Sequence, residues 1–314
     1  MTYQIGNVLD VLPTLAAGRF RCCVTSPPYW GLRDYGHADQ LGLEPTPAEY
    51  VERMVRVFRE VRRVLADDGT CWINIGDSYA AGGDRQIGRR DADRDTPGGR
   101  GGSFRGGPLS YTKQRDSLKP KDLVGIPWRL AFALQDDGWY LRSDIIWSKP
   151  NPMPESVTDR PTKAHEYVFL LSKSARYFYD AAAIAEKSMT GMTGMTGMTG
   201  GAYDAPGSSP HSNARGDVVS IATDSRNARS VWTIATQPYD GAHFATMPPA
   251  LAERCVLAGS AIGDEVLDPF LGSGTTGQVA EALGRRWFGV ELQPDYEPLI
   301  KARTAQVGLF GRTA

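Results

Sequence analysis

Apolar positions near the N-terminal third of the chain recur with the spacing of a helix. Between residues 51 and 65 they are Val51, Met54, Val55, Phe58, Val61 and Leu65. Residues 46–49 (Thr-Pro-Ala-Glu) have the pattern of an N-cap, a proline in the first turn and a capping-box glutamate. Asp67-Asp68-Gly69 is expected to close this helix before a strand over residues 70–75. The pattern predicts one α/β unit.

The same alternation returns in the second half of the chain. The expected elements are a helix over 126–135, strands over 140–147 and 167–171, a helix over 249–258, a strand over 265–267, a helix over 275–283, a strand over 287–290 and a helix from Pro294. Such alternation predicts an α/β fold with a doubly wound, mostly parallel sheet and helices on both faces. Ligands of such sheets bind at the carboxyl ends of the strands.

Two segments interrupt this pattern. Residues 82–107 contain nine glycines, six arginines and four aspartates with almost no apolar residue, which predicts a flexible loop. Met-Thr-Gly is repeated four times between residues 189 and 200. A period of three fits neither helix nor strand, so we expect a mobile insertion there.

Composition narrows the class of protein. With 314 residues, of which 41% are hydrophobic and 23% charged, the chain is that of a globular protein. The four cysteines lack C-x-x-C spacing, the N-terminus lacks the pattern of a signal peptide, and no apolar run reaches membrane-spanning length. We therefore expect a reduced, cytoplasmic protein that does not contact a membrane. The net charge of −1 excludes a uniformly basic binder, although residues 80–235 carry 21 Lys and Arg against 17 Asp and Glu.

A glycine-rich turn follows the strand expected over 265–267. Its sequence, Asp268-Pro269-Phe270-Leu271-Gly272-Ser273-Gly274-Thr275-Thr276, opens a helix whose N-terminus offers free N–H groups. No Gly-Lys-Thr or Gly-Lys-Ser follows, which excludes a P-loop. Glu291 ends the next strand, where doubly wound folds place a carboxylate on ribose hydroxyls. The turn predicts a nucleoside site, although glycines also serve tight geometry and Glu291 could be a surface residue.

A second motif, Ser26-Pro27-Pro28-Tyr29, follows the strand expected over 22–25. Two prolines end that strand and fix the backbone, so that carbonyl groups project rigidly from its end. Ser26 adds a short polar side chain and Tyr29 a flat stacking surface. The combination suits a planar amine, whereas a simple proline turn capped by an aromatic ring is the structural alternative.

Together and in this order, the two motifs resemble those of the amino-methylating DNA methyltransferases, in particular their beta subclass. The resemblance covers roughly residues 3–80, 118–180 and 230–305. It implies a Rossmann-like class I methyltransferase fold and S-adenosylmethionine as the cofactor. It also implies five parts: a catalytic part (1–79), a flexible Gly/Arg-rich insertion (80–117), the continued core (118–180), a target-recognition region with the repeat (181–230) and a cofactor-binding part (231–314).

The resemblance assigns roles to individual residues. The cofactor residues that it implies are Asp268, Phe270, Gly272, Ser273, Gly274, Thr275 and Glu291, with His243 and Pro248 in a partly matching segment where Phe244 and Met247 replace a proline and a lysine. The implied catalytic residues are Ser26, Pro27, Pro28 and Tyr29. Ser26 and the Pro27 carbonyl would accept hydrogen bonds from the target amino group, and Tyr29 would stack on the flipped base. Lys149-Pro150-Asn151-Pro152 and Glu166 resemble later motifs near the base pocket, with a loop cluster and a solvated ion pair as alternatives. Trp30 extends the stacking surface or packs in the core.

An exocyclic amine is a weak nucleophile, and acceptors placed around a tetrahedral nitrogen favour the transition state. Methylation at cytosine carbon-5 needs a thiolate, normally from a Pro-Cys pair, and no cysteine here follows a proline. Serine before Pro-Pro-Tyr is more typical of cytosine-N4 enzymes within the family. The sequence therefore predicts cytosine-N4 methylation of duplex DNA by base flipping and in-line transfer. Adenine-N6 methylation, an RNA-base or protein-amide methyltransferase and a non-catalytic DNA-binding descendant are the alternatives.

DNA contacts are expected from the variable segments. In the glycine-rich loop the candidate phosphate contacts are Arg85, Arg89, Arg90, Arg94, Arg100 and Arg105, with a solvated loop whose aspartates cancel most of the charge as the alternative. In the recognition region the candidate phosphate or guanine contacts are Arg215, Arg226 and Arg229. The resemblance implies either the partner of a cognate restriction endonuclease or an unaccompanied methylase, and a homodimer is left open.

Overall fold

The computed structural model describes residues 2–80, 118–187, 225–237 and 247–305. Residues 1–180 and 229–314 form one compact unit, and residues 181–228 form a second one. In the second unit the described residues form a two-stranded antiparallel ladder of β6 (Glu186–Lys187) and β7 (Ser225–Arg226). The Gly/Arg-rich loop, its arginines, the Met-Thr-Gly repeat, Arg215 and His243 lie outside the described residues.

An eight-stranded sheet runs through the first unit. In spatial order its strands are β1 (Tyr3–Ile5), β10 (Arg286–Glu291), β9 (Glu265–Asp268), β2 (Phe20–Thr25), β3 (Leu65–Ile75), β5 (His165–Ser172), β4 (Tyr140–Ser148) and β8 (Val231–Thr233). Only β5 runs antiparallel to its neighbours, β3 and β4. The expected doubly wound, mostly parallel sheet is confirmed.

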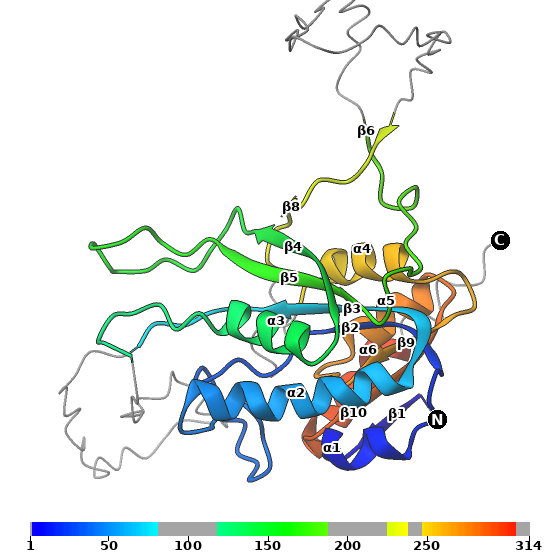
Figure 1. Ribbon diagram of the computed structural model, residues 1–314, viewed down its shortest axis with the longest axis horizontal. Coiled ribbons are helices and arrows are strands. Elements are labelled where there is room, and N and C mark those ends of the chain that lie inside the picture. Colours follow the sequence, from blue (N-terminus) through cyan, green and yellow to red (C-terminus); the bar gives the residue numbers. More distant parts are fainter. Residues whose placement is uncertain (1, 81–117, 188–224, 238–246, 306–314) are drawn as a thin grey trace, which may run out of the picture. The chain divides into compact units, whose positions relative to one another are not determined.

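Helices pack in pairs beside this sheet (Figure 1). They are α1 (Val8–Val11), α2 (Pro47–Val64), α3 (Ile126–Asp136), α4 (Pro249–Gly259), α5 (Thr275–Ala282) and α6 (Glu297–Ala305), with 3-10 turns η1 (Leu12–Thr14) and η2 (Pro294–Tyr296). α2 packs against α3, and α4 packs against α5. Among the described residues, no helix has the length and apolar character needed to cross a bilayer.

The neighbouring cysteines of β2 show how the sheet separates two apolar layers. Cys23 belongs to the core cluster that contains the buried side chains of α2 and α3. Cys22 points the other way, because a Cβ on Gly259 of α4 would lie 2.6 Å from its sulfur. Alternate residues of a strand thus face different helices, and Gly259 permits the close approach of α4.

The start of α2 agrees with the sequence prediction, but its end does not. The Thr46 hydroxyl accepts a hydrogen bond from the Glu49 backbone N–H at 3.2 Å, as an N-cap does. Leu65 is already extended and begins β3, so residues 67–69 lie within the strand rather than closing the helix. The pairing with β2 shifts register there, and Lys173 donates to the Leu65 carbonyl at 2.8 Å. A partner more than 100 residues away therefore determines this boundary.

Candidate active site

The two motifs lie side by side at one edge of the sheet. β2 and β9 are parallel neighbours, with Cys23 paired to Leu267, so the residues that follow both strands emerge together. From this pair the sheet continues through β3 on one side and β10 on the other. The site therefore lies at the topological switch point where open α/β sheets bind ligands.

A cavity of about 650 Å³ lies between the motifs. The predicted site residues that line it are Ser26, Pro27, Pro28, Tyr29, Asp268, Phe270, Gly272, Ser273, Thr275 and Glu291. Gly274 and Pro248 do not line the cavity. Gly274 is the N-cap residue of α5 with a φ of 90°, and Pro248 precedes α4, while the adjacent Met247 does line it. No cysteine lines the cavity, and all four are buried.

Asp268 connects the two motifs. Its carboxylate accepts hydrogen bonds from the Thr25 hydroxyl at 2.6 Å and from the Phe270 backbone N–H at 3.1 Å. The side chain is buried, and burial raises its pKa from 3.8 to about 6 against the opposing effect of these hydrogen bonds. Thr25 ends β2, immediately before the Ser-Pro-Pro-Tyr motif, and therefore orients a carboxylate of the other motif.

Glu291 holds the glycine-rich turn from the end of β10. Its carboxylate accepts hydrogen bonds from the backbone N–H groups of Gly272 at 2.7 Å and Gln293 at 2.8 Å. Burial raises its pKa from 4.5 to about 7, although these hydrogen bonds favour the ionised form. Among the described residues, neither Glu291 nor Asp268 has an ion-pair partner. Two buried carboxylates without cations favour a positively charged ligand in this cavity.

Arg303 of α6 also holds the glycine-rich turn, through two of its hydroxyl side chains. It is buried, donates to the Ser273 hydroxyl at 2.8 Å and also contacts the Thr275 hydroxyl. These bonds fix two side chains that line the cavity at the start of α5. The sequence pattern did not single out Arg303, because an arginine near the end of a C-terminal helix is typical of an exposed residue.

Tyr29 belongs to a buried polar chain at the other end of the cavity. Its phenol donates to the Glu166 carboxylate at 2.5 Å, and the Ser26 hydroxyl contacts the phenol oxygen at 3.5 Å. Asn74 donates to the same carboxylate at 3.1 Å, and Lys149 forms an ion pair with it. Burial, with the nearby carboxylate second, raises the pKa of Tyr29 well above its usual value. The phenol therefore stays protonated and directs its proton toward Glu166.

The proline carbonyls of the motif differ in their partners. The Pro28 carbonyl accepts a hydrogen bond from the Tyr50 hydroxyl at 2.8 Å, which ties the motif to α2. Within the described part of the chain, no hydrogen bond reaches the carbonyl of Pro27, which lines the cavity. Trp30 is 4% exposed, donates to the Glu44 carbonyl and does not line the cavity. Of its two interpretations, the core one is correct.

Sequence reasoning missed several residues of the cavity wall. They include Asn7, Arg33, Tyr35, Asn74, Trp147 and Tyr296. Most come from loops or from strands whose partners are distant in sequence. A single residue of such a type forms no sequence motif from which a site could be predicted. Asn74 had one usable signal, because it is a polar residue inside the apolar strand 70–75.

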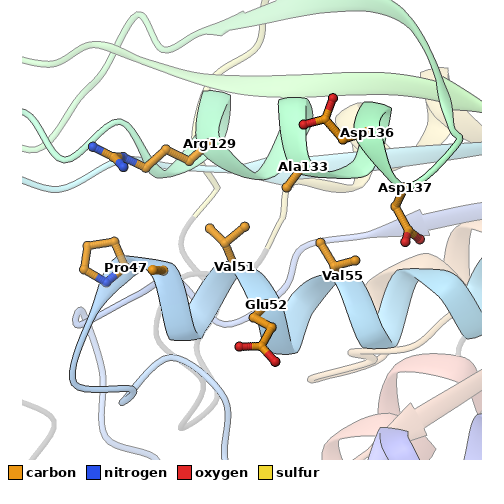
Figure 2. A pocket seen from close by; sticks show the side chains of 9 residues that line it. Pro47, Val51, Glu52, Val55, Arg129, Ala133, Asp136 and Asp137 are labelled. Atoms are coloured by element: carbon orange, nitrogen blue, oxygen red, sulfur yellow. The ribbon is translucent and has the colours of Figure 1, made fainter.

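A second pocket of about 510 Å³ lies between α2 and α3 (Figure 2). Val51, Val55 and Ala133 line it together with acidic residues and Arg129. It contains no residue of either motif. We therefore assign the chemistry to the cavity at the switch point.

This geometry is typical of an α/β enzyme, with a cavity at the carboxyl ends of parallel strands between a glycine-rich turn and the Ser-Pro-Pro-Tyr motif. A family model described as DNA methylase, for the N6- and N4-methylating enzymes, matches residues 20–302. The chain belongs to this family. The expected resemblance is confirmed, and so is the expectation of a DNA methyltransferase that uses S-adenosylmethionine.

Two relatives are similar over nearly the whole chain. The type II methyltransferase M.SmaI of Serratia marcescens is 49% identical over 95% of this chain and 89% of its own length. The type II methyltransferase M.Cfr9I of Citrobacter freundii is 47% identical over 93% of this chain and 83% of its own length. The protein is thus a DNA methyltransferase of the kind found in type II restriction-modification.

Solved structures confirm the class I methyltransferase fold. The cytosine-N4-specific PvuII DNA methyltransferase has a TM-score of 0.62 and is 18% identical, with 98% of this chain and 89% of that chain covered. A putative DNA modification methylase of Thermus thermophilus, in complex with S-adenosyl-L-methionine, has a TM-score of 0.58 and is 23% identical, with 98% of this chain and 93% of that chain covered.

Proposed function

We propose that this protein methylates the exocyclic N4 amino group of cytosine in duplex DNA at a specific sequence. The observation that carries the choice of base is Ser26, an uncharged acceptor at the motif position where the family has Asp, Asn or Ser. Ser26 lines the cavity beside the glycine-rich turn. An uncharged acceptor is chemically sufficient for adenine N6 as well, so that base is the alternative.

The cofactor half of the cavity fits S-adenosylmethionine. Its positive charge matches the buried carboxylate of Asp268, and its ribose hydroxyls can donate to that of Glu291; neither carboxylate has a cationic partner among the described residues. Gly272 has a φ of 55°, so its turn approaches a ligand without a side chain in the way. When bound, the cofactor supplies an electrophilic methyl group, whose carbon–sulfur bond breaks as the amino nitrogen bonds to that carbon.

The catalytic half orients the amine. The Ser26 hydroxyl points its proton toward Tyr29, and Tyr29 points its proton toward Glu166. This direction leaves the lone pairs of Ser26 Oγ free to accept a hydrogen bond from the amino group, and the Pro27 carbonyl accepts the second one. Two such acceptors favour the tetrahedral nitrogen of the transition state. The surplus proton of the nitrogen passes to Ser26 Oγ as the Ser26 proton moves to Tyr29 and the Tyr29 proton moves to the Glu166 carboxylate, which is left protonated.

Lys149 and Asn74 support this polarity. Lys149 pairs with Glu166 and also lies 4.4 Å from the ring centre of Trp147, so its cation stabilises the carboxylate from inside the cavity wall. Asn74 donates to Glu166 and to the Tyr167 carbonyl at 3.3 Å. Glu166 accepts the hydrogen bonds of Tyr29 and Asn74, which keeps both hydroxyl protons directed away from the substrate.

We also propose that residues 181–230 contain the target-recognition region, with Arg226 and Arg229 among its candidate contacts. Arg226 pairs with Glu186 at 3.2 Å within the β6–β7 ladder. A restriction endonuclease of the same sequence specificity is the proposed partner, supported by the type II names of the relatives.

A nucleoside assay tests the base. Duplex DNA from a methylation-free host is incubated with the protein and methyl-labelled cofactor, digested to nucleosides and analysed by mass spectrometry. Labelled N4-methylcytosine is the expected product, and Ser26→Ala serves as the inactive control. Labelled N6-methyladenine would contradict the choice of base, and label in RNA or protein but not in DNA would contradict the proposed function.

A further inference from the structure

Met153 is unusually exposed for an apolar side chain. Its exposed fraction is 85%, and no other large hydrophobic residue in the described ranges exceeds it. Single exposed apolar side chains are common on protein surfaces, so the position of Met153 beside the active-site cavity, rather than its exposure alone, makes it a candidate contact for a partner.

The backbone around Met153 is stiff. Pro152 and Pro154 flank it, and proline fixes its own φ while restricting the preceding residue to extended conformations. Further along the loop, Arg160 pairs with Glu155 at 2.6 Å and lies 3.8 Å from the ring centre of Tyr79. A rigid loop holds an apolar tip outward with little entropic cost on binding.

The loop is anchored to the rim of the active-site cavity. Asn151 donates to the Thr236 carbonyl at 3.2 Å and accepts from the Thr236 backbone N–H at 3.0 Å. Thr236 and Lys149 both line the cavity. Met153 is two residues beyond Asn151, so it lies within about 7 Å of this anchor along the chain.

The loop leaves the sheet at the same edge as the two motifs. β4 ends at Ser148 opposite His165, the first residue of β5, and Tyr167 pairs with Ile75 at the end of β3. The β4–β5 loop, residues 149–164, therefore leaves the sheet at the edge where β2 and β9 deliver the two motifs. Figure 1 shows this loop in green beyond the arrowhead of β4.

We propose that Met153 is a wedge that enters the DNA base stack where the target base leaves it. The inference rests on the proposed function, because a flipped base leaves a gap beside the cavity that receives it. Apolar side chains, methionine among them, insert between base steps in proteins that distort DNA. A wedge fixed to the cavity rim stabilises the open duplex while Ser26 and Tyr29 hold the base.

Base pairing at the target distinguishes this role from a general DNA contact. Single-turnover methyl transfer is measured for the wild type, Met153→Ala, Met153→Leu and Ile262→Ala. The substrates are unmethylated duplexes that contain the sequence recognised by the protein, with the target base either paired or mismatched. Ile262 is the matched control, because it is 80% exposed in the turn before the amino end of β9, away from the cavity.

We expect Met153→Ala to transfer methyl about tenfold more slowly on the paired duplex and to regain most of that rate on the mismatch, since opening a mismatched pair costs less. Met153→Leu and Ile262→Ala should match the wild type, and all melting temperatures should agree. An unchanged rate for Met153→Ala on paired DNA, or an equal loss on both duplexes, would overturn the wedge. Absence of DNA methylation by the wild type would instead overturn the proposed function itself.

Discussion

The Thr25 hydroxyl donates a hydrogen bond to the Asp268 carboxylate at 2.6 Å, across 243 positions of the sequence. Thr25 ends the strand that delivers the amine clamp, and Asp268 ends the strand that delivers the cofactor turn. Both side chains are buried. This hydrogen bond therefore joins the ends of the two strands beyond their backbone pairing and lowers the pKa of the Asp268 carboxyl, which we propose as a cofactor ligand.

Thr25→Val should weaken cofactor binding in a pH-dependent way. The hydroxyl lowers the pKa of Asp268, so its removal raises that pKa above about 6 and leaves less carboxylate near neutral pH. We expect S-adenosylmethionine affinity to fall about tenfold at neutral pH and to recover partly as the pH rises. Calorimetric titration across this pH range measures the effect. Thr14→Val, which removes an exposed hydroxyl bonded to the Val11 carbonyl, is the control and should change nothing.

Asp268→Asn should change the pH dependence of stability in the cofactor-free protein. Burial raises the pKa of Asp268 from 3.8 to about 6 in the folded state. Between these two pKa values the folded state therefore binds more protons than the unfolded state. The free energy of unfolding of the wild type therefore falls as the pH rises through this range, by on the order of 3 kcal/mol from this one group. The variant should lack that share of the decline in urea unfolding experiments. Parallel pH profiles for the two proteins would contradict the assignment.

The carboxylates of Asp268 and Glu291 should both determine cofactor binding. Glu291→Gln keeps the size of the side chain and removes the charge, but it leaves an acceptor for only one of the Gly272 and Gln293 N–H groups, because these bond to different oxygens of the carboxylate. We expect weaker S-adenosylmethionine binding and a somewhat lower melting temperature, because one buried backbone N–H loses its acceptor. Undiminished affinity in both Glu291→Gln and Asp268→Ala would contradict the placement of the cofactor at this turn.

Local signals predicted the elements whose boundaries are determined locally. Thr46 caps α2 as its sequence indicated, and the prolines after Thr25 end β2. The predicted end of α2 was wrong, because the pairing of residues 65–70 depends on β2 and on Lys173. The strands β1 and β8 have three residues each, too few for a periodic pattern.

The motifs of the site could likewise be recognised in the sequence, whereas the hydrogen bonds that join them could not be predicted. Glu166 resembled a residue near the base pocket, but its hydrogen bonds with Tyr29 and Asn74 join three strands or strand ends that are far apart in sequence. Arg303 showed no pattern in the sequence, because burial of its charge depends on the hydroxyls of Ser273 and Thr275.

Tyr29→Phe and Glu166→Gln should be coupled. Each breaks the chain of donors that keeps the lone pairs of Ser26 directed at the substrate, so each should lower single-turnover methyl transfer by about 10- to 100-fold, as expected for a hydrogen bond to a charged group. The double variant should be little worse than either single one, since both act through the same chain. Cofactor affinity should not change.

Glu265→Gln provides the control for that cycle. Glu265 pairs with Arg19 at the amino end of β9, outside the cavity. It should transfer methyl at the wild-type rate. Additive losses in the Tyr29 and Glu166 double variant would show that the two residues act separately, against the proposed chain.

Arg303→Leu should loosen the cofactor turn. It removes donors from the Ser273 and Thr275 hydroxyls inside the protein, so we expect weaker S-adenosylmethionine binding and a loss of about 1–3 kcal/mol in unfolding free energy. Arg303→Lys should restore part of the affinity. Lys301→Leu, on the exposed side of the same helix, should leave affinity unchanged in the same titrations.

Expression in a methylation-free bacterial host, followed by single-molecule sequencing of its genomic DNA, tests the central claim most directly. The wild type should leave N4-methylcytosine at nearly every copy of one short sequence, and Ser26→Ala should leave none while still binding S-adenosylmethionine. Methylation by Ser26→Ala at the wild-type level, or modified adenine in place of modified cytosine, would contradict the account.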